Sequence, residues 1–384
     1  MTDFENILPL WRELEGAGAD YVLATIVDVE GPSYRKPGAR MLLARDGRRA
    51  GTVSGGCLEA EVARRAWWLT ESGPTVERYS TVPDDGDMPY GSGCGGVVHI
   101  LLERRATAFP LLTALEAAFR ARVSLAIATV LEGSQIGVRA FSGLSQEHTE
   151  KSTGNRRDRL ISDLQDLAGL ACAGEKSLDQ IALNDGKGTR VWVDFRPARP
   201  GLWIFGAGDD AKPVLRLARG LGWFVAVCDG RTHLVTRERF QEADQVHVLT
   251  APELPAPLPG GLDLRPTDAA IVMTHSFEQD SRLLAMLFHD STSPSFGYLG
   301  VLGPQRRTHD MLTEAARLNH HQRPEERADQ WLAQLHAPTG LDLGAETPAT
   351  IALSILAEIQ RVMTGATALP LREVRAAKTQ IVQR

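Results

Sequence analysis

Two cysteines of this chain lie inside clusters of glycine. The two clusters consist of Ser54, Gly55, Gly56 and Cys57, and of Gly93, Cys94, Gly95 and Gly96. Glycine lacks side-chain bulk and tolerates positive φ, so the backbone N–H groups of such loops can converge on an anion. A core cysteine usually lies in an apolar run instead. The clusters therefore predict a site where two thiols and a set of main-chain amides face one anionic ligand.

The first cluster precedes a predicted helix over residues 58–70, which places Cys57 at a helix N-terminus. The helix macrodipole there lowers the pKa of a thiol and attracts anions. Ser54 can donate to an anionic oxygen, and Glu59 can cap the first turn. The alternative is a tight turn before a helix with a small buried cysteine, but a second glycine-nested cysteine favours the ligand site. Basic residues near this loop in sequence that can supply counter-charge are Arg35, Lys36 and Arg40.

A third motif lies in the second half of the chain. Gly206-x-Gly208-x-x-Ala211 follows a predicted strand and opens a predicted helix, which is the setting of a dinucleotide-binding loop. Asp229 ends the next strand, where a ribose-binding acid is expected. Two acids, Asp209 and Asp210, stand at the helix N-terminus, where a pyrophosphate needs positive potential. The motif predicts a Rossmann-like unit and leaves a bound nucleotide and a purely architectural role equally open.

Two further candidates follow later strands. His275 comes directly after a predicted strand over residues 269–273, at the sheet edge where such folds bind ligands, with a structural turn histidine as the alternative. Arg306, with Arg307 beside it, can meet a phosphate, with solvated helix-start charges as the alternative. No His, Lys and Tyr set of a familiar dehydrogenase is legible, so no catalytic residue is predicted.

Composition limits the remaining possibilities. The four cysteines are too few and scattered for a disulfide scaffold, and Cys172 and Cys228 lie in apolar stretches typical of core residues. The net charge of −6 argues against nonspecific nucleic-acid binding, which needs a basic surface. No apolar run approaches a membrane span, and the acidic N-terminus does not resemble a signal peptide. We therefore expect a cytoplasmic protein that binds neither nucleic acid nor membrane.

The first half is expected to alternate helices and strands. Predicted helices cover 4–16, 58–70 and 107–121, and predicted strands cover 21–29, 39–45, 48–53, 75–81, 97–103, 125–131 and 191–195. The strands that include Leu23 and Leu125 both end in Glu-Gly, which hints at an internal repeat. The polar segment 142–160 is expected to be a mobile surface insertion.

The second half is expected to form a parallel sheet. Predicted strands cover 202–205, 224–229, 245–249, 269–273 and 298–302, separated by helical segments. The segment from Arg196 to Gly201 reads as a linker. The predicted fold class is α/β, with an N-terminal α/β domain containing a mixed sheet over 1–196 and a C-terminal Rossmann-like domain over 197–384.

These residues resemble the xanthine dehydrogenase accessory and carbon monoxide dehydrogenase maturation-factor family, the XdhC/CoxI type. The resemblance spans most of the chain, and its motifs are residues 24–40, 51–59, 93–96, 205–208, 274–275, 298–307 and 340–348. It implies a non-catalytic chaperone that binds the molybdenum cofactor, a molybdopterin. It also implies help with cofactor sulfuration by a cysteine desulfurase, and insertion into an apo molybdenum hydroxylase.

On this resemblance the cofactor site consists of both glycine clusters, with Cys57 and Cys94 at or near the metal, since soft thiolates suit molybdenum. The Rossmann half, with Gly206, Gly208, Asp229, His275 and Arg306, would complete the site, dock a partner or bind a nucleotide. A homodimer is compatible with this organisation. The alternatives are an NAD(P)-dependent oxidoreductase with a thiol-assisted site and a sulfur-transfer enzyme that carries a persulfide on one of the two cysteines.

Overall fold

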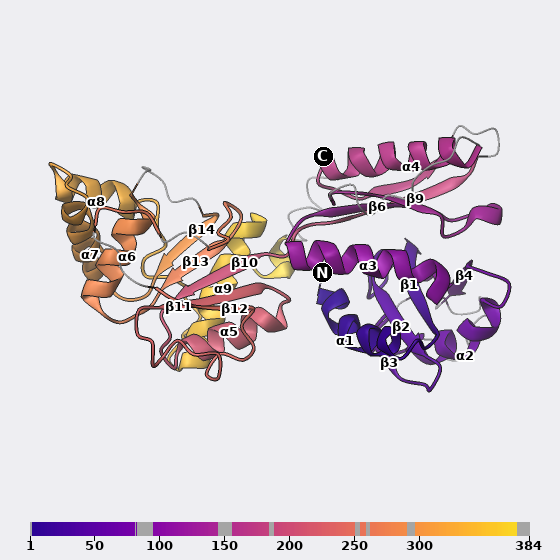
Figure 1. Cartoon of the computed structure of the whole chain (residues 1–384), viewed down its shortest axis with the longest axis horizontal. Coiled ribbons are helices and arrows are strands. Elements are labelled where there is room, and N and C mark those ends of the chain that lie inside the picture. The colour runs from indigo at the N-terminus through magenta and orange to yellow at the C-terminus, as the bar shows by residue number, and fades with distance from the viewer. Residues whose placement is uncertain are drawn as a thin grey trace. The chain divides into compact units, whose positions relative to one another are not determined.

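The computed structural model describes residues 2–80, 82, 95–144, 156–183, 188–249, 254–258, 262–289 and 296–374. The chain divides into two compact units, Met1–Arg199 and Pro200–Arg384 (Figure 1). In the first unit the strands belong to two sheets, and in the second they belong to one sheet.

The first sheet of unit 1 carries the cysteine loop. Its strands are β1 (Tyr21–Glu30), β2 (Arg40–Ala44), β3 (Arg49–Gly51), β4 (Thr75–Ser80) and β5 (Val97–Arg104). Their order is β3-β2-β1-β5-β4, and every neighbouring pair is antiparallel. The predicted hairpin is present, because Gly47 takes the positive φ of 91° that the turn between β2 and β3 requires.

The second sheet of unit 1 repeats this plan. Its strands are β6 (Leu125–Val130), β7 (Arg139–Ser142), β8 (Leu178–Ala182) and β9 (Arg190–Arg196), in the antiparallel order β7-β6-β9-β8. This order matches β2-β1-β5-β4 of the first sheet strand for strand, so the Glu-Gly similarity of β1 and β6 reflects a repeated topology. The α/β class is confirmed, but the expected mixed sheet of this unit is two antiparallel sheets, since the hydrogen-bonded neighbours in both run in opposite directions.

The helices of unit 1 cover the sheets and join them. They are α1 (Thr2–Gly16), α2 (Glu59–Leu69), α3 (Arg105–Ala121) and α4 (Arg156–Ala173), with a 3-10 turn at Gly133–Gln135. Buried side chains of α3, such as Leu111 and Leu115, share one apolar cluster with Leu23 of the first sheet and Ile127 of the second. Residues 145–155 of the expected mobile insertion over 142–160 lie outside the described residues. The expectation is wrong at its end, where residues 156–160 begin α4 and Leu160 is buried against the second sheet.

Unit 2 is a doubly wound parallel sheet. Its strands are β10 (Gly201–Phe205), β11 (Phe224–Asp229), β12 (Gln245–Val248), β13 (Ala269–Val272) and β14 (Tyr298–Val301), in the order β12-β11-β10-β13-β14. All neighbouring pairs are parallel, as predicted for a Rossmann-like domain. The strand order reverses between β10 and β13, which is where ligand sites form in such sheets.

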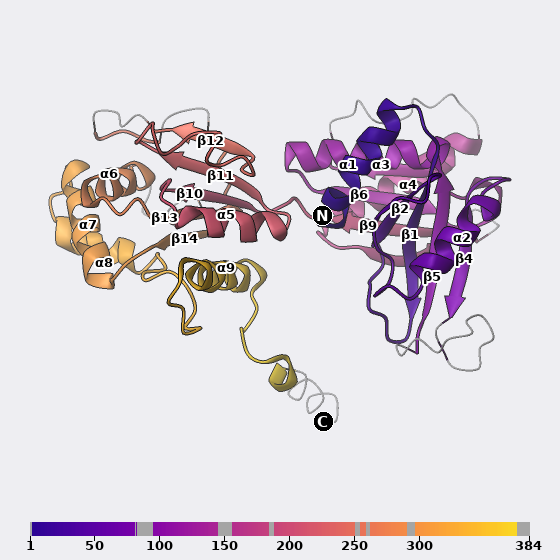
Figure 2. The ribbon, with the colours of Figure 1, turned by 90° about the horizontal axis from the view of Figure 1, so that it is seen from below.

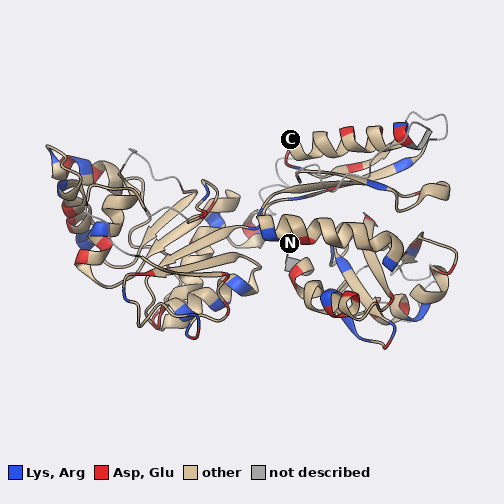
Figure 3. Ribbon diagram, viewed as in Figure 1, with Lys and Arg blue, Asp and Glu red and all other residues tan. Residues whose placement is uncertain are grey.

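Alternating side chains divide the core of unit 2 between two faces of the sheet. Leu202 and Ile204 pack under α5 (Ala211–Gly220) and α9 (Pro348–Thr364), whereas Trp203 and Phe205 pack under the helices of the opposite face. Those helices are α6 (Phe277–Leu287), α7 (Gln305–Leu318) and α8 (Pro324–Leu332), and Figure 2 shows the two groups on opposite sides. Basic and acidic residues are interspersed along the outer helices α7 and α8 (Figure 3), where Arg317 pairs with Glu325.

Candidate functional site

Cys57 is exposed on the loop that joins β3 to α2. The two ends of the loop are anchored, because Val53 and Leu58 are buried in the apolar cluster under α2. Gly56 has φ of 114° and open space where a side chain would lie. The structure thus places a thiol at the surface between two fixed points, and the alternative of a buried packing cysteine is wrong.

The main-chain donors of this loop are directed at a carboxylate of the chain itself. Oε1 of Glu59 accepts hydrogen bonds from Ser54 N (2.8 Å) and Val53 N (3.2 Å), and also from the hydroxyl of Thr52. Oε2 of Glu59 accepts from the hydroxyl of Ser54, whose oxygen in turn accepts from Gly56 N (3.0 Å) and Leu58 N (3.1 Å). Glu59 therefore provides an internal anion for Val53 N and Ser54 N, whereas Gly56 N and Leu58 N donate to the Ser54 hydroxyl oxygen.

The protonation of Glu59 follows from these contacts. Burial by itself raises the pKa of this carboxyl, but hydrogen bonds from Ser54, Thr52 and the backbone outweigh burial and lower the pKa to about 2. Ser54 can donate to an external anion only by releasing Glu59. The cofactor contacts predicted for Ser54, Gly55 and Gly56 stay predictions, whereas the role of Glu59 is larger than the capping role expected from the sequence.

The described end of the second glycine cluster lies beside the first. Gly93 and Cys94 are outside the described residues. A Cβ on Gly96 would lie 2.0 Å from Pro32 O, so this position accepts only glycine. Gly96 and Cys57 line one small depression with Tyr34, with a volume of about 20 Å³, which holds no more than a water molecule. The fold thus joins segments distant in sequence, while the adjacency of Cys94 to Cys57 stays a prediction.

One of the three predicted counter-charges has another function. Arg40 is buried and its guanidinium pairs with Asp194 of β9 at 2.9 Å, so it ties the two sheets of unit 1 together. Burial lowers the pKa of Arg40 to about 10 in spite of that partner. The expectation that Arg40 serves the cysteine loop is wrong, because its side chain extends from β2 to Asp194 of the second sheet.

The glycine loop of unit 2 packs tightly against a neighbouring strand. Gly206 has φ of 138°, and a Cβ there would lie 2.4 Å from Met273 O. Gly208 is covered by the side chain of Asp210, whose Oδ1 would be 2.5 Å from an added Cβ. The loop has the backbone form of a dinucleotide-binding turn, but a carboxylate stands over it.

Asp229 is fully engaged at the end of β11. Its Oδ2 accepts from Ala207 N (2.7 Å) and from Arg231 Nη2 (2.7 Å), and its Oδ1 accepts from Arg231 N and Nε. Burial raises the pKa of Asp229, but the bonds from Arg231 and Ala207 prevail and the net pKa is lowered. A ribose hydroxyl would compete with these partners, so the predicted ribose contact stays a prediction without support from the geometry.

The other acids of the loop are also ion-paired. Asp209 accepts from Lys212 at 2.8 Å and from Arg239 at 3.0 Å. Asp210 contacts His275 Nε2 at 2.6 Å, and His275 itself has a positive φ of 65°. His275 thus lies at the sheet edge as the sequence placed it, and its described partner is the glycine-loop acid.

Sequence reasoning selected Arg306, but the structure engages the next residue. Arg306 is exposed, whereas Arg307 pairs with Asp280 at 3.0 Å. Asp280 is buried and accepts from the Thr274 hydroxyl at 2.5 Å, so it links the end of β13 to α6 and α7. The sequence signal that could have identified Asp280 is an acidic residue on the buried side of α6. The phosphate contact of Arg306 stays a prediction.

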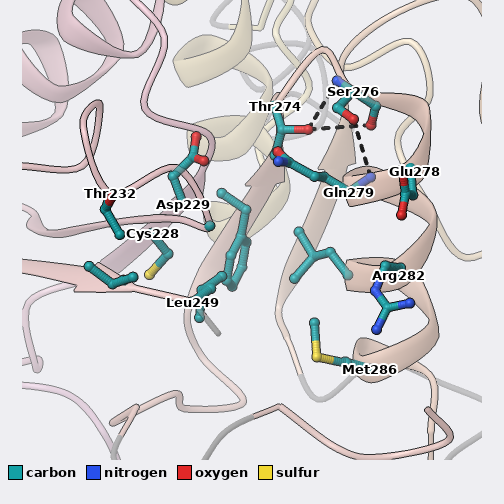
Figure 4. A pocket seen from close by; sticks show the side chains of 14 residues that line it. Cys228, Asp229, Thr232, Leu249, Thr274, Ser276, Glu278, Gln279, Arg282 and Met286 are labelled. Carbon is teal, nitrogen blue, oxygen red and sulfur yellow. Dashed lines mark hydrogen bonds between the residues drawn. The ribbon is translucent and has the colours of Figure 1, made fainter. Parts of the chain in front are cut away.

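A cavity of about 530 Å³ opens at the carboxyl ends of β10, β11, β12 and β13 (Figure 4). One wall is apolar, and its residues are Phe205, Cys228, Leu249, Leu283 and Met286. The rim is polar and includes Thr232, Ser276, Glu278, Gln279 and Arg282. Asp229 is the lining residue that the sequence analysis selected as a site residue. The apolar wall was not predicted, because it combines strand ends and a helix that lie far apart in the chain.

The remaining cysteines are structural, as expected. Burial raises the pKa of the Cys228 thiol to about 12, with a smaller contribution from Asp229, so this thiol stays protonated. Cys172 is half-buried in α4. Among the described residues no three His, Cys, Asp or Glu side chains gather as a metal site. Within the same residues, no helix combines the length and apolar character of a bilayer span.

Fold and site together define a class of protein: an α/β protein in which a unit with an exposed, glycine-flanked thiol precedes a Rossmann unit. The chain belongs to the XdhC and CoxI family. The model of that family matches residues 14–80, which include the Cys57 loop, and the model of the XdhC Rossmann domain matches residues 202–359.

Individual relatives agree with this assignment. The chain is 31% identical to a probable xanthine dehydrogenase subunit of Bacillus subtilis, over 88% of this chain and 92% of the relative. It is 26% identical to the molybdenum cofactor insertion chaperone PaoD of Escherichia coli, over 94% of this chain and 89% of PaoD. A crystal structure described as a xanthine dehydrogenase from Bacillus halodurans superposes with a TM-score of 0.68 at 26% identity, covering 96% of this chain and 97% of that chain.

Proposed function

We propose that this protein binds the molybdenum cofactor and inserts it into an apo xanthine dehydrogenase-type molybdenum hydroxylase. Membership of the XdhC and CoxI family and the similarity to PaoD support this function. The observation that carries the proposal is the exposed Cys57 thiol on a loop held in place by Glu59. The molybdenum cofactor is cargo here, and the protein needs to hold it reversibly.

The arrangement of the Cys57 loop suits such a carrier. Thiolate sulfur is a soft ligand that suits the sulfur-rich molybdenum centre of the cofactor. Because the Glu59 network already orders the loop, little conformational entropy is lost when the cofactor binds. Four loop amides already donate to Glu59 or to the Ser54 hydroxyl oxygen, so Cys57 rather than these amides is the principal contact in this proposal. Cys94 and the glycines beside it would supply the second part of the site.

The proposal extends to sulfuration of the cofactor, with a cysteine desulfurase as the sulfur donor. In this step the Cys57 thiolate attacks the terminal sulfur of the desulfurase persulfide. A new S–S bond forms on Cys57 as the donor's S–S bond breaks, and the donor cysteine leaves as a thiolate, so no external oxidant is required. We further propose a cytoplasmic location and a homodimer, which cell fractionation and gel filtration respectively can test.

Cofactor uptake is the direct test. The full chain, expressed together with an active molybdenum-cofactor pathway, is expected to co-purify with molybdenum and with a fluorescent pterin after oxidation. Cys57→Ala is expected to lose most of the bound molybdenum, whereas the matched control Cys172→Ala keeps it. Absence of pterin from the unmodified protein would overturn the chaperone function, and full retention by Cys57→Ala would overturn the thiol contact alone.

The alternative prediction of an NAD(P)-dependent oxidoreductase gains nothing from the site. Asp229 is occupied by Arg231 and by Ala207 N, and Asp210 lies over Gly208. Saturable binding of a nicotinamide nucleotide with hydride transfer would revive that alternative.

A further inference from the structure

The exposed face of α2 continues directly from the thiol that the proposed function uses. We propose that this face is the surface on which the apo molybdenum hydroxylase docks to receive the cofactor, with Trp68 as the anchor of the interface. The inference rests on the proposed function, because it states where the recipient of the cargo binds. It concerns the helix after the loop and not the contacts of the cofactor itself.

The exposed residues of α2 follow the helical period from the cysteine onward. They are Cys57, Ala60, Arg64 and Trp68, and together they are called the α2 face. Val62 N donates to Leu58 O at 2.9 Å, so helical hydrogen bonding begins directly after the cysteine. Residues three and four positions apart share one side of a helix. The opposite side packs onto the first sheet through Leu58, Val62 and Ala66. One continuous stripe of α2 is therefore left for a partner.

Trp68 is the large apolar side chain of this stripe. It is 66% exposed and belongs to none of the apolar clusters formed by the described residues. Its neighbour Trp67 is half-buried, and the Cζ atoms of Arg45 and Arg104 lie 4.8 and 5.5 Å from the centre of its ring. Covering an exposed indole is favourable, and tryptophan is enriched among the residues that dominate protein interfaces. Trp68 thus has the properties of an interface anchor.

A second exposed aromatic ring lies beside Cys57. Tyr34 is 71% exposed and lines the small depression with the cysteine. Its ring comes within 3.7 Å of the place where a Cβ on Gly55 would stand. Among the described Phe, Tyr and Trp side chains, Tyr34 and Trp68 have the largest exposed fractions. The thiol therefore has one exposed ring next to it and another at the far end of α2, and both residue types are common at interfaces.

The size of a protein interface connects Trp68 with the transfer of the cargo. A recipient has to bring its cofactor site to the Cys57 sulfur. A standard interface covers about 800 Å² on each partner, which is a disc of about 16 Å in radius. At a rise of about 1.5 Å per residue, Trp68 lies about 16 Å along the helix from Cys57. An interface centred on the thiol thus reaches Trp68, whereas a sulfur donor has to present only one cysteine to Cys57.

Charge indicates the chemistry of the facing surface. Arg64 is exposed, and its pair with Glu61 at 2.6 Å lies at the surface, where an ion pair is weak and easily exchanged. Arg45, stacked on Trp67, makes no ion pair among the described residues. Guanidinium groups prefer carboxylates, which accept two parallel hydrogen bonds from them. The recipient is therefore expected to offer an apolar pocket for the indole of Trp68 with carboxylates at its rim.

Binding of the full chain to an apo hydroxylase tests the proposal. The xanthine dehydrogenase-type hydroxylase of the same organism is purified from a host that makes no molybdenum cofactor. Calorimetry then measures its Kd for the chain with and without bound cofactor. Trp68→Ala is expected to raise the Kd at least about tenfold, as loss of an interface anchor does. Leu170→Ala is the matched control, because Leu170 is 64% exposed on α4, and it should leave the Kd unchanged.

Further measurements separate docking from the binding of cargo. Trp68→Ala should keep the molybdenum and pterin content and the gel-filtration volume of the unmodified protein, and a desulfurase should still place sulfur on its Cys57.

Four results would overturn the docking surface. They are no binding of the hydroxylase to either form of the chain, an unchanged Kd in Trp68→Ala, an equal loss in Leu170→Ala, and a changed oligomeric state or lost sulfur transfer in Trp68→Ala. A changed oligomeric state would assign the α2 face to a second copy of this chain, and lost sulfur transfer would assign it to the sulfur donor. Docking that depends on Trp68 in a chain that never carries pterin would support the surface while the cofactor function fails.

Discussion

Glu59 and Ser54 are joined by two hydrogen bonds, one from the main-chain amide of Ser54 to Oε1 of Glu59 and one from its hydroxyl to Oε2. The serine oxygen in turn accepts from two further loop amides. A first-turn helix carboxylate thus organises the whole loop that presents Cys57. This pair gives the loop a fixed form before any ligand arrives.

Removing the charge of Glu59 should loosen the loop. In Glu59→Gln the amide nitrogen faces donors instead of accepting from them, so we expect the free energy of unfolding to fall by about 1–3 kcal/mol. Urea denaturation followed by circular dichroism measures this loss. Glu61→Gln, on the same helix and paired with Arg64 and Arg65 at the surface, should change the stability by less than about 1 kcal/mol. Equal effects of the two variants would contradict the importance of the Glu59 network.

The same network predicts a pH dependence. The pKa of Glu59 is lowered on folding, so its stabilisation is fully present above the ordinary carboxyl pKa of 4.5 and is lost as the pH falls toward about 2. The difference in unfolding free energy between the unmodified protein and Glu59→Gln should therefore shrink as the pH is lowered through this window. Urea titrations in a pH series measure it. A difference that stays constant through the window would show that these hydrogen bonds do not lower the pKa of Glu59.

The cysteines should differ in reactivity. Cys57 is exposed, whereas Cys228 is buried with its pKa raised to about 12. Iodoacetamide added to the native protein should modify Cys57 within minutes and leave Cys228 unmodified until denaturant is present. Peptide mass spectrometry of timed samples distinguishes the sites. Rapid native labelling of Cys228 would contradict the packing of β11.

Gly206 should tolerate no side chain. Its φ of 138° and the 2.4 Å separation between an added Cβ and Met273 O predict that Gly206→Ala destabilises unit 2 by at least about 2 kcal/mol. Thermal unfolding measures the loss. Gly220→Ala is the matched control, because nothing lies within 4 Å of its added Cβ and it ends α5. The control is expected to be neutral or to stabilise the protein by up to about 1 kcal/mol.

Loss of the Asp229 partner should be costly. Arg231→Met leaves a carboxylate with no exposed side-chain surface and with only backbone donors, which we expect to cost about 2–3 kcal/mol. Asp229→Asn combined with Arg231→Met removes the unpaired charge and should recover part of the loss. The exposed pair of Arg216 and Glu242 provides the control Arg216→Met, with an expected change below about 1 kcal/mol. Denaturant unfolding measures all three, and no recovery in the double variant would contradict the pairing.

Much of the fold follows from local sequence patterns. The parallel sheet of unit 2 was predictable because its strands are short apolar runs separated by helices, and Gly206 marks the turn between the first strand and helix. The antiparallel pairing in unit 1 was less legible, because strand direction depends on connections between distant segments. The hint of a repeat in β1 and β6 became clear only when both sheets showed the same strand order.

The sequence by itself determined where the glycine-flanked thiol and the glycine loop lie, because both depend on backbone conformations that only a few residue types adopt. Only the tertiary structure decided what those loops hold. Glu59 accepts from amides of the cysteine loop, Asp210 covers Gly208, and Arg231 with Ala207 N engages the Asp229 carboxylate that was expected to bind ribose. The cavity of unit 2 is assembled from strand ends and α6. The physical reason is that hydrogen-bond donors and apolar walls are assigned by three-dimensional proximity, which spacing along a chain does not encode.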